Sequence, residues 1–252
     1  MKATTITGVE ELLHEVVGAA IEYPVARFYR GHAVNSWKLV PSVHRSYSYE
    51  DEQAMMIRFR NEAQTKYSNC PHDSDFARWL VLAQHYGLPT RLLDWTYSPL
   101  YALYFGVFHE SRQGPAAVWQ LNAGRLNEQT CGEYGIRHLS HESMLPVLNP
   151  VFRGSEQINT VVAVGAPEVD VRMSVQQSMY TVHGDPTPLD EHPNADDFLR
   201  KFEIPESSKA DIKMQLRLLS IRRSTLFPDL GNLAIELSEQ IHKLGKLDGE
   251  SG

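Results

Sequence analysis

The segment QHYGLPTRLLDWT, residues 84–96, places a cation, Arg91, and a carboxylate, Asp94, in an otherwise apolar run. Pro89 and Pro99 bracket this run, so it is too short for a helix and is predicted to be a buried strand between two helices. Side chains alternate between the two faces of a strand. The predicted faces are Arg91, Leu93 and Trp95 on one side and Leu92, Asp94 and Thr96 on the other.

Periodic apolar positions around this strand predict a succession of helices and strands. Helices are predicted over residues 8–21, 50–67, 76–87, 98–110 and 207–221, with Ser207 or Ser208 as the cap of the last, and a final loop and helix over 226–245. Further strands are predicted over residues 23–31, 114–122, 159–165, 172–184 and 198–205, while residues 123–150 have a mixed pattern. No compositional break marks a linker. We therefore expect one α+β domain over residues 1–252, with a central mixed or antiparallel sheet region flanked by helices.

The composition excludes several classes of protein. The 252 residues carry a formal net charge of −7, which argues against a generally basic surface for nucleic acid, and the cations of residues 213–224 are interpreted as a solvated helix face. No run approaches the roughly 20 apolar residues that span a bilayer, and the N-terminus lacks a signal-peptide core, so a cytoplasmic protein without membrane contact is expected. Cys70 and Cys131 lack metal or redox spacing and are expected to be reduced thiols.

Several signatures of known chemistry are absent from the sequence. There is no glycine-rich dinucleotide motif or P-loop, no GxSxG and no HExxH. The histidines and aspartates of residues 183–192, and the histidines of residues 138–141, could ligate a metal, but loop side chains without a third fixed partner are usually only solvated. No metal site is therefore expected.

Three polar segments remain as candidates for a site. In FYRGH, residues 28–32, Arg30 ends a strand and is suited to a bidentate grip on phosphate or carboxylate, and Gly31 lets a partner approach the backbone closely. The second segment is residues 84–96. The third is RMSVQQSMYTVHG, residues 172–184, in which Arg172 and the pair Gln176 and Gln177 precede an aromatic-bearing strand.

A structural role is the alternative for each of these residues. Arg30 or Arg91 paired with Asp94 would form a buried ion pair that fixes the topology, since the loss of one partner of such a pair is strongly destabilising. Asp94 could instead cap the helix that follows it. Two further alternatives are that His85 satisfies the terminal carbonyls of its helix and that Gln176 completes a backbone hydrogen bond.

Two of these segments resemble the FRG-domain family of bacterial and phage proteins, which is named for an aromatic-Arg-Gly motif. Tyr29, Arg30 and Gly31 correspond to that motif. Residues 84–105 carry the family's second motif, QHYGLPTRLLDWT followed by PL-x-ALYF, almost intact. The resemblance implies a single FRG domain.

A third element of the family, Arg followed by Gln-x-Gly-x-Phe, is similar to the later polar segment. It corresponds to Arg172, Gln176, Ser178 and Tyr180, with serine for glycine and tyrosine for phenylalanine. The closing LFPDL, residues 226–230, is also family-like. The core of the domain is thereby expected over about residues 25–237.

The order of the motifs is also similar to that of ADP-ribosyltransferases. Tyr29 and Arg30 resemble their first motif, residues 90–96 followed by ALYF (102–105) resemble their second, and Gln176 or Gln177 occupies the place of their catalytic glutamate. This similarity implies an ADP-ribosyltransferase-like fold and NAD as a substrate. The reaction would transfer ADP-ribose through an oxocarbenium-like centre, which depends on positioning and electrostatics.

The resemblance also assigns roles to individual residues. Arg30 would grip a phosphate or ribose of NAD, and Tyr86 or Tyr180 would stack on nicotinamide. The residues expected to bind the dinucleotide are Tyr29, Arg30, Gly31, Tyr86, Thr90, Arg91, Thr96 and Tyr180, and those expected to act in catalysis are Arg30, His85, Asp94 and Gln176. Glutamine lacks the charge of the glutamate in those transferases, and Glu156 would substitute for it if the strand assignment is wrong.

Three hypotheses of function follow. The first is an ADP-ribosyltransferase-like enzyme in a toxin or phage-defence setting, whose target, protein or nucleic acid, is unspecified. The second is a non-enzymatic binding or regulatory module in which Arg30, Arg91 and Asp94 form a structural network. The third is a hydrolase acting on nucleic acid through His85 and Asp94, which would depend on a divalent metal.

Overall fold

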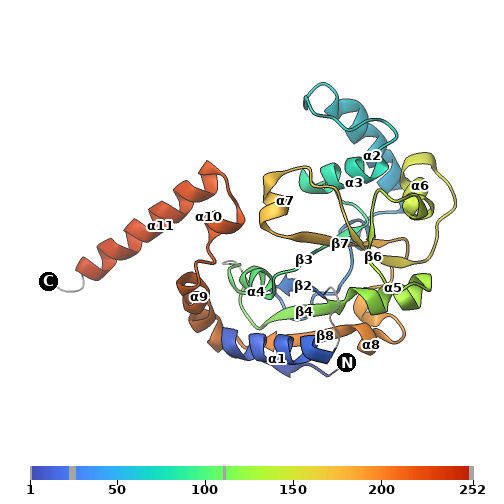
Figure 1. Cartoon of the computed structure of the whole chain (residues 1–252). Coiled ribbons are helices and arrows are strands. Elements are labelled where there is room, and N and C mark those ends of the chain that lie inside the picture. Colours follow the sequence, from blue (N-terminus) through green and yellow to red (C-terminus); the bar gives the residue numbers. More distant parts are fainter. Residues whose placement is uncertain (1, 23–26, 110–111, 250–252) are drawn as a thin grey trace.

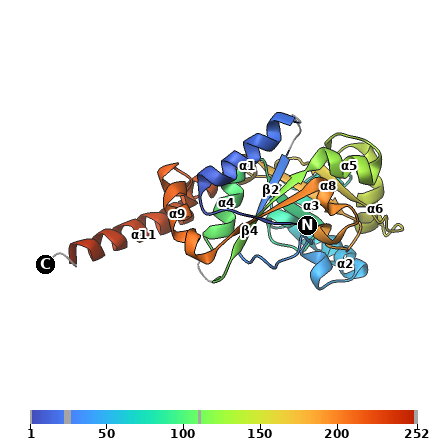
Figure 2. The same cartoon turned by 90° about the horizontal axis from the view of Figure 1, so that it is seen from below.

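The computed structural model describes residues 2–22, 27–109 and 112–249, and these form one eight-stranded sheet flanked by helices (Figures 1 and 2). In spatial order the strands are β1 (Thr4–Thr5), β8 (Leu199–Ile204), β4 (Ala116–Asn122), β2 (Arg27–His32), β3 (Leu92–Thr96), β7 (Ser178–His183), β6 (Val161–Gly165) and β5 (Arg137–His138). The pairs β1–β8 and β5–β6 are parallel, and the other neighbours are antiparallel. The expected α+β class with a central mixed sheet is confirmed.

The predicted helices are present, with ends shifted by a few residues. Of the strand predicted over residues 23–31, residues 27–31 lie in β2, and residues 23–26 lie outside the described residues. The helices are α1 (Val9–Glu22), α2 (Tyr49–Ala63), α3 (Phe76–His85), α4 (Pro99–Val107), α5 (Ala123–Cys131), α6 (Leu145–Arg153), α7 (Val171–Val175), α8 (Ala195–Phe198), α9 (Lys209–Leu218), α10 (Arg223–Leu226) and α11 (Leu230–Gly249). The segment 123–150, whose pattern assigned no element, holds α5, β5 and most of α6. Within the described residues, no helix combines the length and the apolar character needed to cross a bilayer.

Of the alternation predicted for residues 90–96, hydrophobic packing confirms the part from Leu92 onward. Arg91 does not share the face of Leu93 and Trp95, because it precedes β3 and its guanidinium bonds to α2 and α6, the side on which Leu92 packs. Leu92 packs with side chains of α2, α3 and α6. Leu93 and Trp95 point to the other face of the sheet and pack with side chains of α5 and α8. A further cluster joins α1, α4 and α9 to β4 and β8. Strand β3 is thus covered on both faces.

The contact between β2 and α4 depends on Gly31. A β-carbon at residue 31 would overlap the carbonyl oxygen of Ala102 and lie 2.6 Å from the backbone nitrogen of Gly106. Real β-carbons do not approach backbone atoms this closely, so only glycine lets the helix lie against the strand here. The partner that approaches the backbone at Gly31 is therefore α4.

Helix caps settle two expectations from the sequence. The hydroxyl of Ser98 accepts a hydrogen bond from the backbone N–H of Tyr101 at 3.3 Å and begins α4, so the alternative that Asp94 caps this helix is wrong. Ser208 occupies the N-cap position of α9 as predicted, but its side chain makes no capping hydrogen bond.

The prediction of one strand over residues 172–184 is wrong for its first part. Asp170 accepts a hydrogen bond from the backbone N–H of Arg172 at 2.7 Å, and this cap starts the short helix α7. Gln176 is the C-cap of α7, and Gln177 turns the chain with a φ of 51°. Strand β7 then begins at Ser178, so the serine at the family's glycine position is accommodated as extended backbone.

Candidate functional site

The three polar segments meet at a cleft of about 340 Å³ between the sheet and helices α3, α4 and α7. Its lining comprises Tyr29, Arg30, Gly31, Gln84, His85, Asp94, Trp95, Thr96, Phe105, Arg172, Met173, Gln176, Ser178 and Tyr180. Tyr29 and Tyr180, 151 positions apart in the chain, thus share one concave surface, because β2, β3 and β7 are neighbours in the sheet. A volume of this size lies in the range of small-molecule sites, roughly 300–1,000 Å³.

Arg30 lies where β2 and β3 separate. The register between these strands has one described pair, Tyr29 with Thr96. Beyond it, Nη1 of Arg30 donates to the backbone oxygen of Asp94 at 2.6 Å and lies 3.9 Å from the Asp94 carboxylate. Burial lowers the pKa of Arg30, and the charge of Asp94 acts in the opposite direction. The expected partnership of Arg30 with Asp94 is present, although it runs mainly through the Asp94 backbone.

His32 holds the guanidinium of Arg30 from the other side. Nε of Arg30 donates to Nε2 of His32 at 3.1 Å. Burial, followed by the charge of Arg30, lowers the pKa of His32 to about 3, so the ring is neutral and Nε2 is an acceptor. A guanidinium has five N–H donors. The bonds to His32 and Asp94 use two of them, which leaves donors for an anion in the cleft.

Asp94 is the one carboxylate among the described residues that line the cleft. Its side chain is 54% exposed. Gln84 donates to Oδ2 of Asp94 at 2.9 Å, and the other atom of the same amide, Oε1, accepts from the hydroxyl of Thr90 at 2.5 Å. Thr90 and Gln84 therefore orient a carboxylate that remains open to a ligand. The role of Gln84 was not predicted, although the residue opens the central motif.

His85 also lines the cleft. Nε2 of its ring is 3.8 Å from Oδ2 of Asp170, and its ring meets Tyr86 edge to face at 5.1 Å. The described contacts of His85 are thus with side chains. They do not include the last backbone carbonyls of α3, which the alternative of a helix-capping role for His85 predicts.

The far wall of the cleft comes from α7 and β7. Tyr180 is buried, and burial raises the pKa of its hydroxyl, with the charge of Asp94 as the next contribution. The phenol therefore remains protonated. The hydroxyl of Thr96 donates to the backbone oxygen of Gln176 at 2.7 Å, and the Gln176 amide donates to the backbone oxygen of Leu226 at 2.9 Å. The alternative that Gln176 completes a backbone hydrogen bond is confirmed.

Comparison with protein-family models identifies the segment that supplies two walls of this cleft. Residues 26–114 match the model described as the FRG domain. This segment of the chain is similar to the FRG domain. The matched residues include both Arg30 and Asp94, whereas α7 and β7 lie outside the match. A search of curated proteins and a search of solved structures found no match.

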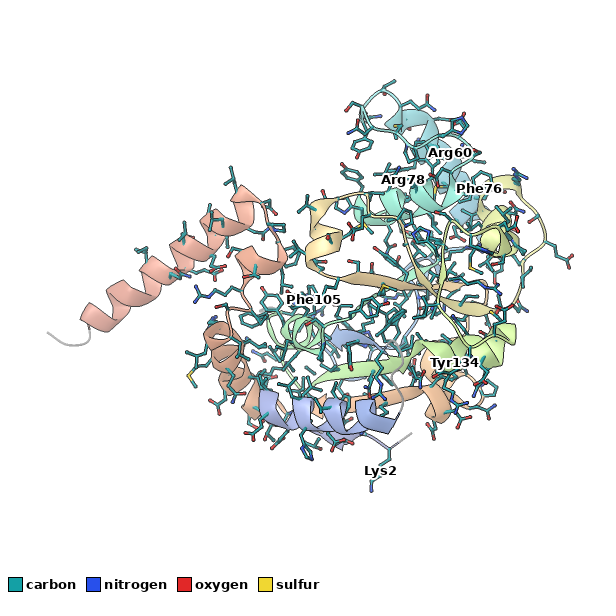
Figure 3. The ribbon with its side chains drawn as sticks, in the orientation of Figure 1. Lys2, Arg60, Phe76, Arg78, Phe105 and Tyr134 are labelled. Atoms are coloured by element: carbon teal, nitrogen blue, oxygen red, sulfur yellow. The ribbon has the colours of Figure 1, made fainter. Side chains whose placement is uncertain are left out.

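The cleft is completed by residues that follow the matched segment. Arg172 contributes a second guanidinium to the lining, 4.4 Å from the ring centre of Phe227. Phe227 also meets Phe105 of α4, which is labelled in Figure 3, edge to face at 6.2 Å. The LFPDL segment thus lies at the rim of the cleft. The wider boundaries expected for the domain, residues 1–252 with a core at 25–237, stay a prediction.

Arg91 of the central motif lies outside the cleft. Its guanidinium and the carboxylate of Glu52 on α2 are each 1% exposed, and Nη2 of Arg91 lies 2.6 Å from Oε2 of Glu52. The alternative that pairs Arg91 with Asp94 is therefore wrong, because Arg91 precedes the strand and extends toward α2. A buried ion pair does fix the topology here, but its partner is an acid that the sequence did not single out.

Two other sequence candidates also lie away from the cleft. Tyr86 is exposed and lines an apolar pocket of about 480 Å³ between α2 and α3. Glu156 lies in the loop before β6 and is not among the residues that line the cleft. Of Tyr86 and Tyr180, the two tyrosines predicted to stack on nicotinamide, only Tyr180 lines the same cleft as Arg30.

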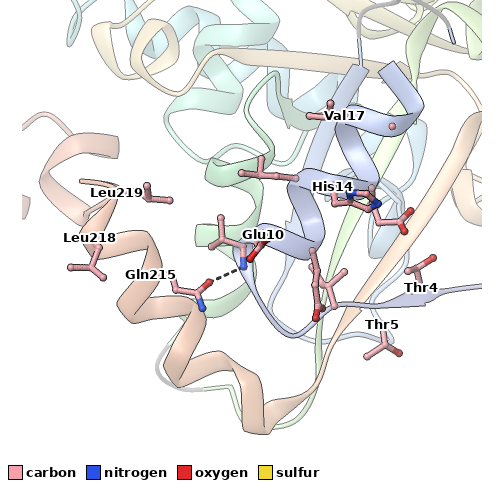
Figure 4. Close-up of a pocket in the computed structure, with 14 residues that line it drawn as sticks. Thr4, Thr5, Glu10, His14, Val17, Gln215, Leu218 and Leu219 are labelled. Carbon is pink, nitrogen blue, oxygen red and sulfur yellow. Dashed lines mark hydrogen bonds between the residues drawn. The ribbon is translucent and has the colours of Figure 1, made fainter. Parts of the chain in front are cut away.

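A larger and more open groove of about 1050 Å³ lies between α1 and α9 (Figure 4). It is lined by apolar side chains such as Val17 and Leu218, with glutamates at its rim. None of the motif residues lines it, so it is separate from the predicted chemistry. Among the described residues, no three His, Cys, Asp or Glu side chains are grouped so that they could hold a metal ion. Both cysteines are free thiols.

Proposed function

We propose that the cleft binds NAD and that the protein is an ADP-ribosyltransferase-like enzyme. One observation carries the proposal: two guanidiniums, Arg30 and Arg172, share a cleft with the carboxylate of Asp94 and the aromatic ring of Tyr180. Guanidiniums bind phosphate through paired hydrogen bonds, and aromatic rings stack on planar bases. Cations, a carboxylate and a ring in one small cleft suit a ligand that combines phosphate, ribose and a planar base.

In the proposed reaction, the bond between the nicotinamide nitrogen and the ribose C1′ breaks. The electron pair of that bond leaves with nicotinamide, and a nucleophilic atom of the acceptor forms a new bond to C1′. The proton of the nucleophile passes to a base. We assign this role to His85, the one histidine among the described residues that line the cleft.

Asp94 takes the part that the sequence assigned to Gln176. Positive charge develops on the ribose as the glycosidic bond breaks, and a fixed carboxylate beside it lowers the energy of the transition state. The Gln176 amide is committed to the backbone oxygen of Leu226. Asp94 is half-exposed in the cleft and oriented by Gln84, so it is the available source of negative charge.

Calorimetric titration with NAD and an assay of nicotinamide release test the proposal. Arg30→Ala removes a charged hydrogen-bonding group, an effect of about 1.5–3 kcal/mol, so NAD binding should weaken roughly 10- to 100-fold. Arg30→Lys should restore little, because lysine lacks the planar fork. Asp94→Asn should lower the rate of nicotinamide release about 100-fold and change affinity less.

Arg58→Ala is the matched control, since it removes an exposed cation on α2 outside the cleft. It should bind NAD and release nicotinamide as the unsubstituted protein does. Absence of NAD binding, or equal behaviour of the Arg30→Ala and Arg58→Ala proteins, would sink the proposal. Release of nucleotides from nucleic acid that depends on a divalent metal would favour the hydrolase hypothesis instead.

A non-enzymatic binding module is the second candidate. The observation that favours it is the fixed arrangement of Arg30 between His32 and Asp94, which would hold an anion without reacting with it. It predicts saturable NAD binding that depends on Arg30, with no nicotinamide release. A toxin or phage-defence setting follows from the resemblance to known families and remains part of the proposal.

A further inference from the structure

The guanidinium of Arg172 contacts an aromatic ring rather than a carboxylate. Its central carbon lies over the ring of Phe227, 4.4 Å from the ring centre, well within the roughly 6 Å at which an aromatic face attracts a cation. Within the described part of the chain, this guanidinium makes no hydrogen bond and no ion pair. The ring covers one face of the guanidinium plane, whereas its five N–H groups lie at the edge. All of these donors are therefore available to a ligand of the cleft.

The ring of Phe227 has a fixed position at the rim of the cleft. Phe227 ends α10 because Pro228 follows, and its φ of −124° and ψ of 85° lie outside the helical region. Beside it, the Gln176 amide donates to the backbone oxygen of Leu226 at 2.9 Å, and the ring of Phe105 meets Phe227 edge to face at 6.2 Å. Figure 1 shows α10 next to α7, which it contacts. The segment after α9 thus places an aromatic surface against two walls of the cleft.

The carboxylates near this segment already have other partners. Asp229 accepts hydrogen bonds from the backbone N–H and the side-chain amide of Asn232, at 2.9 and 2.7 Å, where α11 begins. Asp94 accepts from Gln84 at 2.9 Å on the opposite side of the cleft lining. Neither forms an ion pair with Arg172 among the described residues. An anion from a ligand would therefore be the first hydrogen-bonding partner of this guanidinium.

We propose that Phe227 is a positioning residue for Arg172 and that the two form a subsite for the diphosphate group of the ligand. The inference rests on the proposed function for the identity of that ligand. A guanidinium on a ring keeps its paired N–H groups in one plane, the arrangement that grips two phosphate oxygens. The ring also orders the side chain before the ligand arrives, so less conformational freedom is lost on binding. Arg30 lines the same cleft, so two guanidiniums match the two phosphates.

The subsite determines which ligands the cleft distinguishes. NAD, ADP-ribose and inorganic pyrophosphate each carry two linked phosphates, whereas nicotinamide riboside carries none. Substitution of Arg172 or Phe227 should therefore weaken binding of the first three compounds and leave binding of nicotinamide riboside unchanged. Both residues lie outside residues 26–114, the segment similar to the FRG domain. Recognition of phosphate is thus divided between that segment, which carries Arg30, and a later part of the chain.

Calorimetric titration with inorganic pyrophosphate tests the subsite in the absence of any reaction. Arg172→Ala should weaken pyrophosphate binding roughly 10- to 100-fold, because it removes a charged hydrogen-bonding group. Phe227→Leu keeps an apolar side chain but removes the ring, and it should weaken binding roughly 2- to 10-fold, because Arg172 is no longer ordered beforehand. Phe227→Tyr keeps the ring and should bind pyrophosphate as the unsubstituted protein does. Circular dichroism and thermal melting establish that each variant is folded.

A combined variant separates positioning from a general structural role. If Phe227 acts through Arg172, Phe227→Leu should have no further effect on pyrophosphate binding in the Arg172→Ala protein. Phe108→Leu is the matched control, since Phe108 lies under the guanidinium of Arg217 at 5.2 Å but does not line the cleft. It should leave pyrophosphate binding unchanged.

Several results would overturn the subsite. These are an absence of pyrophosphate binding, unchanged binding in the Phe227→Leu protein, a loss in the Phe227→Tyr protein as large as in Phe227→Leu, and an equal effect of Phe227→Leu with and without Arg172. NAD binding and nicotinamide release that do not depend on Arg172 or Phe227 would also overturn it, while the proposed function would stand. Pyrophosphate binding that depends on both residues, without any NAD binding, would support the subsite and overturn the proposed function.

Discussion

The ion pair between Arg91 and Glu52 provides the sharpest test of how this fold is held together. Both side chains are 1% exposed, and the Glu52 carboxylate accepts hydrogen bonds from the backbone N–H, Nε and Nη2 of Arg91. We consider the substitution Glu52→Gln, which keeps the shape of the side chain and removes its charge. The guanidinium of Arg91 would then remain buried without a counter-charge.

The expected cost follows from the burial of the two groups. Loss of one partner of a buried pair destabilises a protein by about 3–5 kcal/mol, because the remaining charge is uncompensated. An exposed pair contributes only about 0–1 kcal/mol. Asp94→Asn, which affects a side chain that is 54% exposed, is therefore expected to cost no more than about 1 kcal/mol. The two substitutions differ by the same atom exchange and so form a matched pair.

Equilibrium unfolding in urea measures both free energies. For a protein of this length, the cost of Glu52→Gln corresponds to a fall in Tm of about 10 °C. Replacing both partners, Glu52→Leu with Arg91→Met, should be less destabilising than Glu52→Gln alone, since no charge is left buried. If Asp94→Asn were as destabilising as Glu52→Gln, the reasoning would be refuted, and Asp94 would have the structural role of the second hypothesis.

Three further predictions concern residues around the cleft. Gly31→Ala should destabilise the protein by about 3 kcal/mol or more in the same unfolding assay, because its β-carbon overlaps the backbone of Ala102; a neutral effect would mean that α4 shifts freely. His32 should make the free energy of unfolding fall by about 2 kcal/mol between pH 6.5 and pH 5, because its pKa is about 3 in the folded protein and the unfolded chain therefore binds one more proton. The His32→Gln variant should lose this part of the pH dependence of stability. An unchanged pH dependence would contradict the lowered pKa of His32. Gln176→Glu should not raise nicotinamide release, because it replaces the donor to Leu226 with an acceptor; increased release would return the catalytic role to residue 176.

Local pattern was enough to predict much of the architecture. The segment 90–96 is bracketed by prolines, and its alternation correctly placed Leu92 on one face and Leu93 on the other. Apolar spacing located the main helices to within a few residues. These features depend on neighbours in the sequence, for which helix and strand periods are direct signals.

Local pattern failed where a short cap or turn competes with a strand. The apolar residues of 172–184 fit a single strand, but the Asp170 side chain caps a one-turn helix, and Gln177 adopts a left-handed conformation. Such a turn at a residue other than glycine leaves a weak signal in the sequence. Gln176 was therefore predicted in a strand but is the C-cap of helix α7. It still lines the cleft, as expected.

The sequence by itself determined the α+β class, the central strand and the FRG motifs, because each is written in contiguous residues. Only the tertiary structure decided which charges meet. Arg91 donates hydrogen bonds to Glu52, 39 positions away, while Arg30 donates to the backbone oxygen of Asp94, 64 positions away. One pair is buried and structural and the other is open to a ligand, although both arginines occur in similar apolar surroundings in the sequence. The packing of helices and strands determines how deeply a charged side chain is buried, and burial determines the free-energy cost of that charge. Because the packed elements are distant along the chain, this cost cannot be read from neighbouring residues in the sequence.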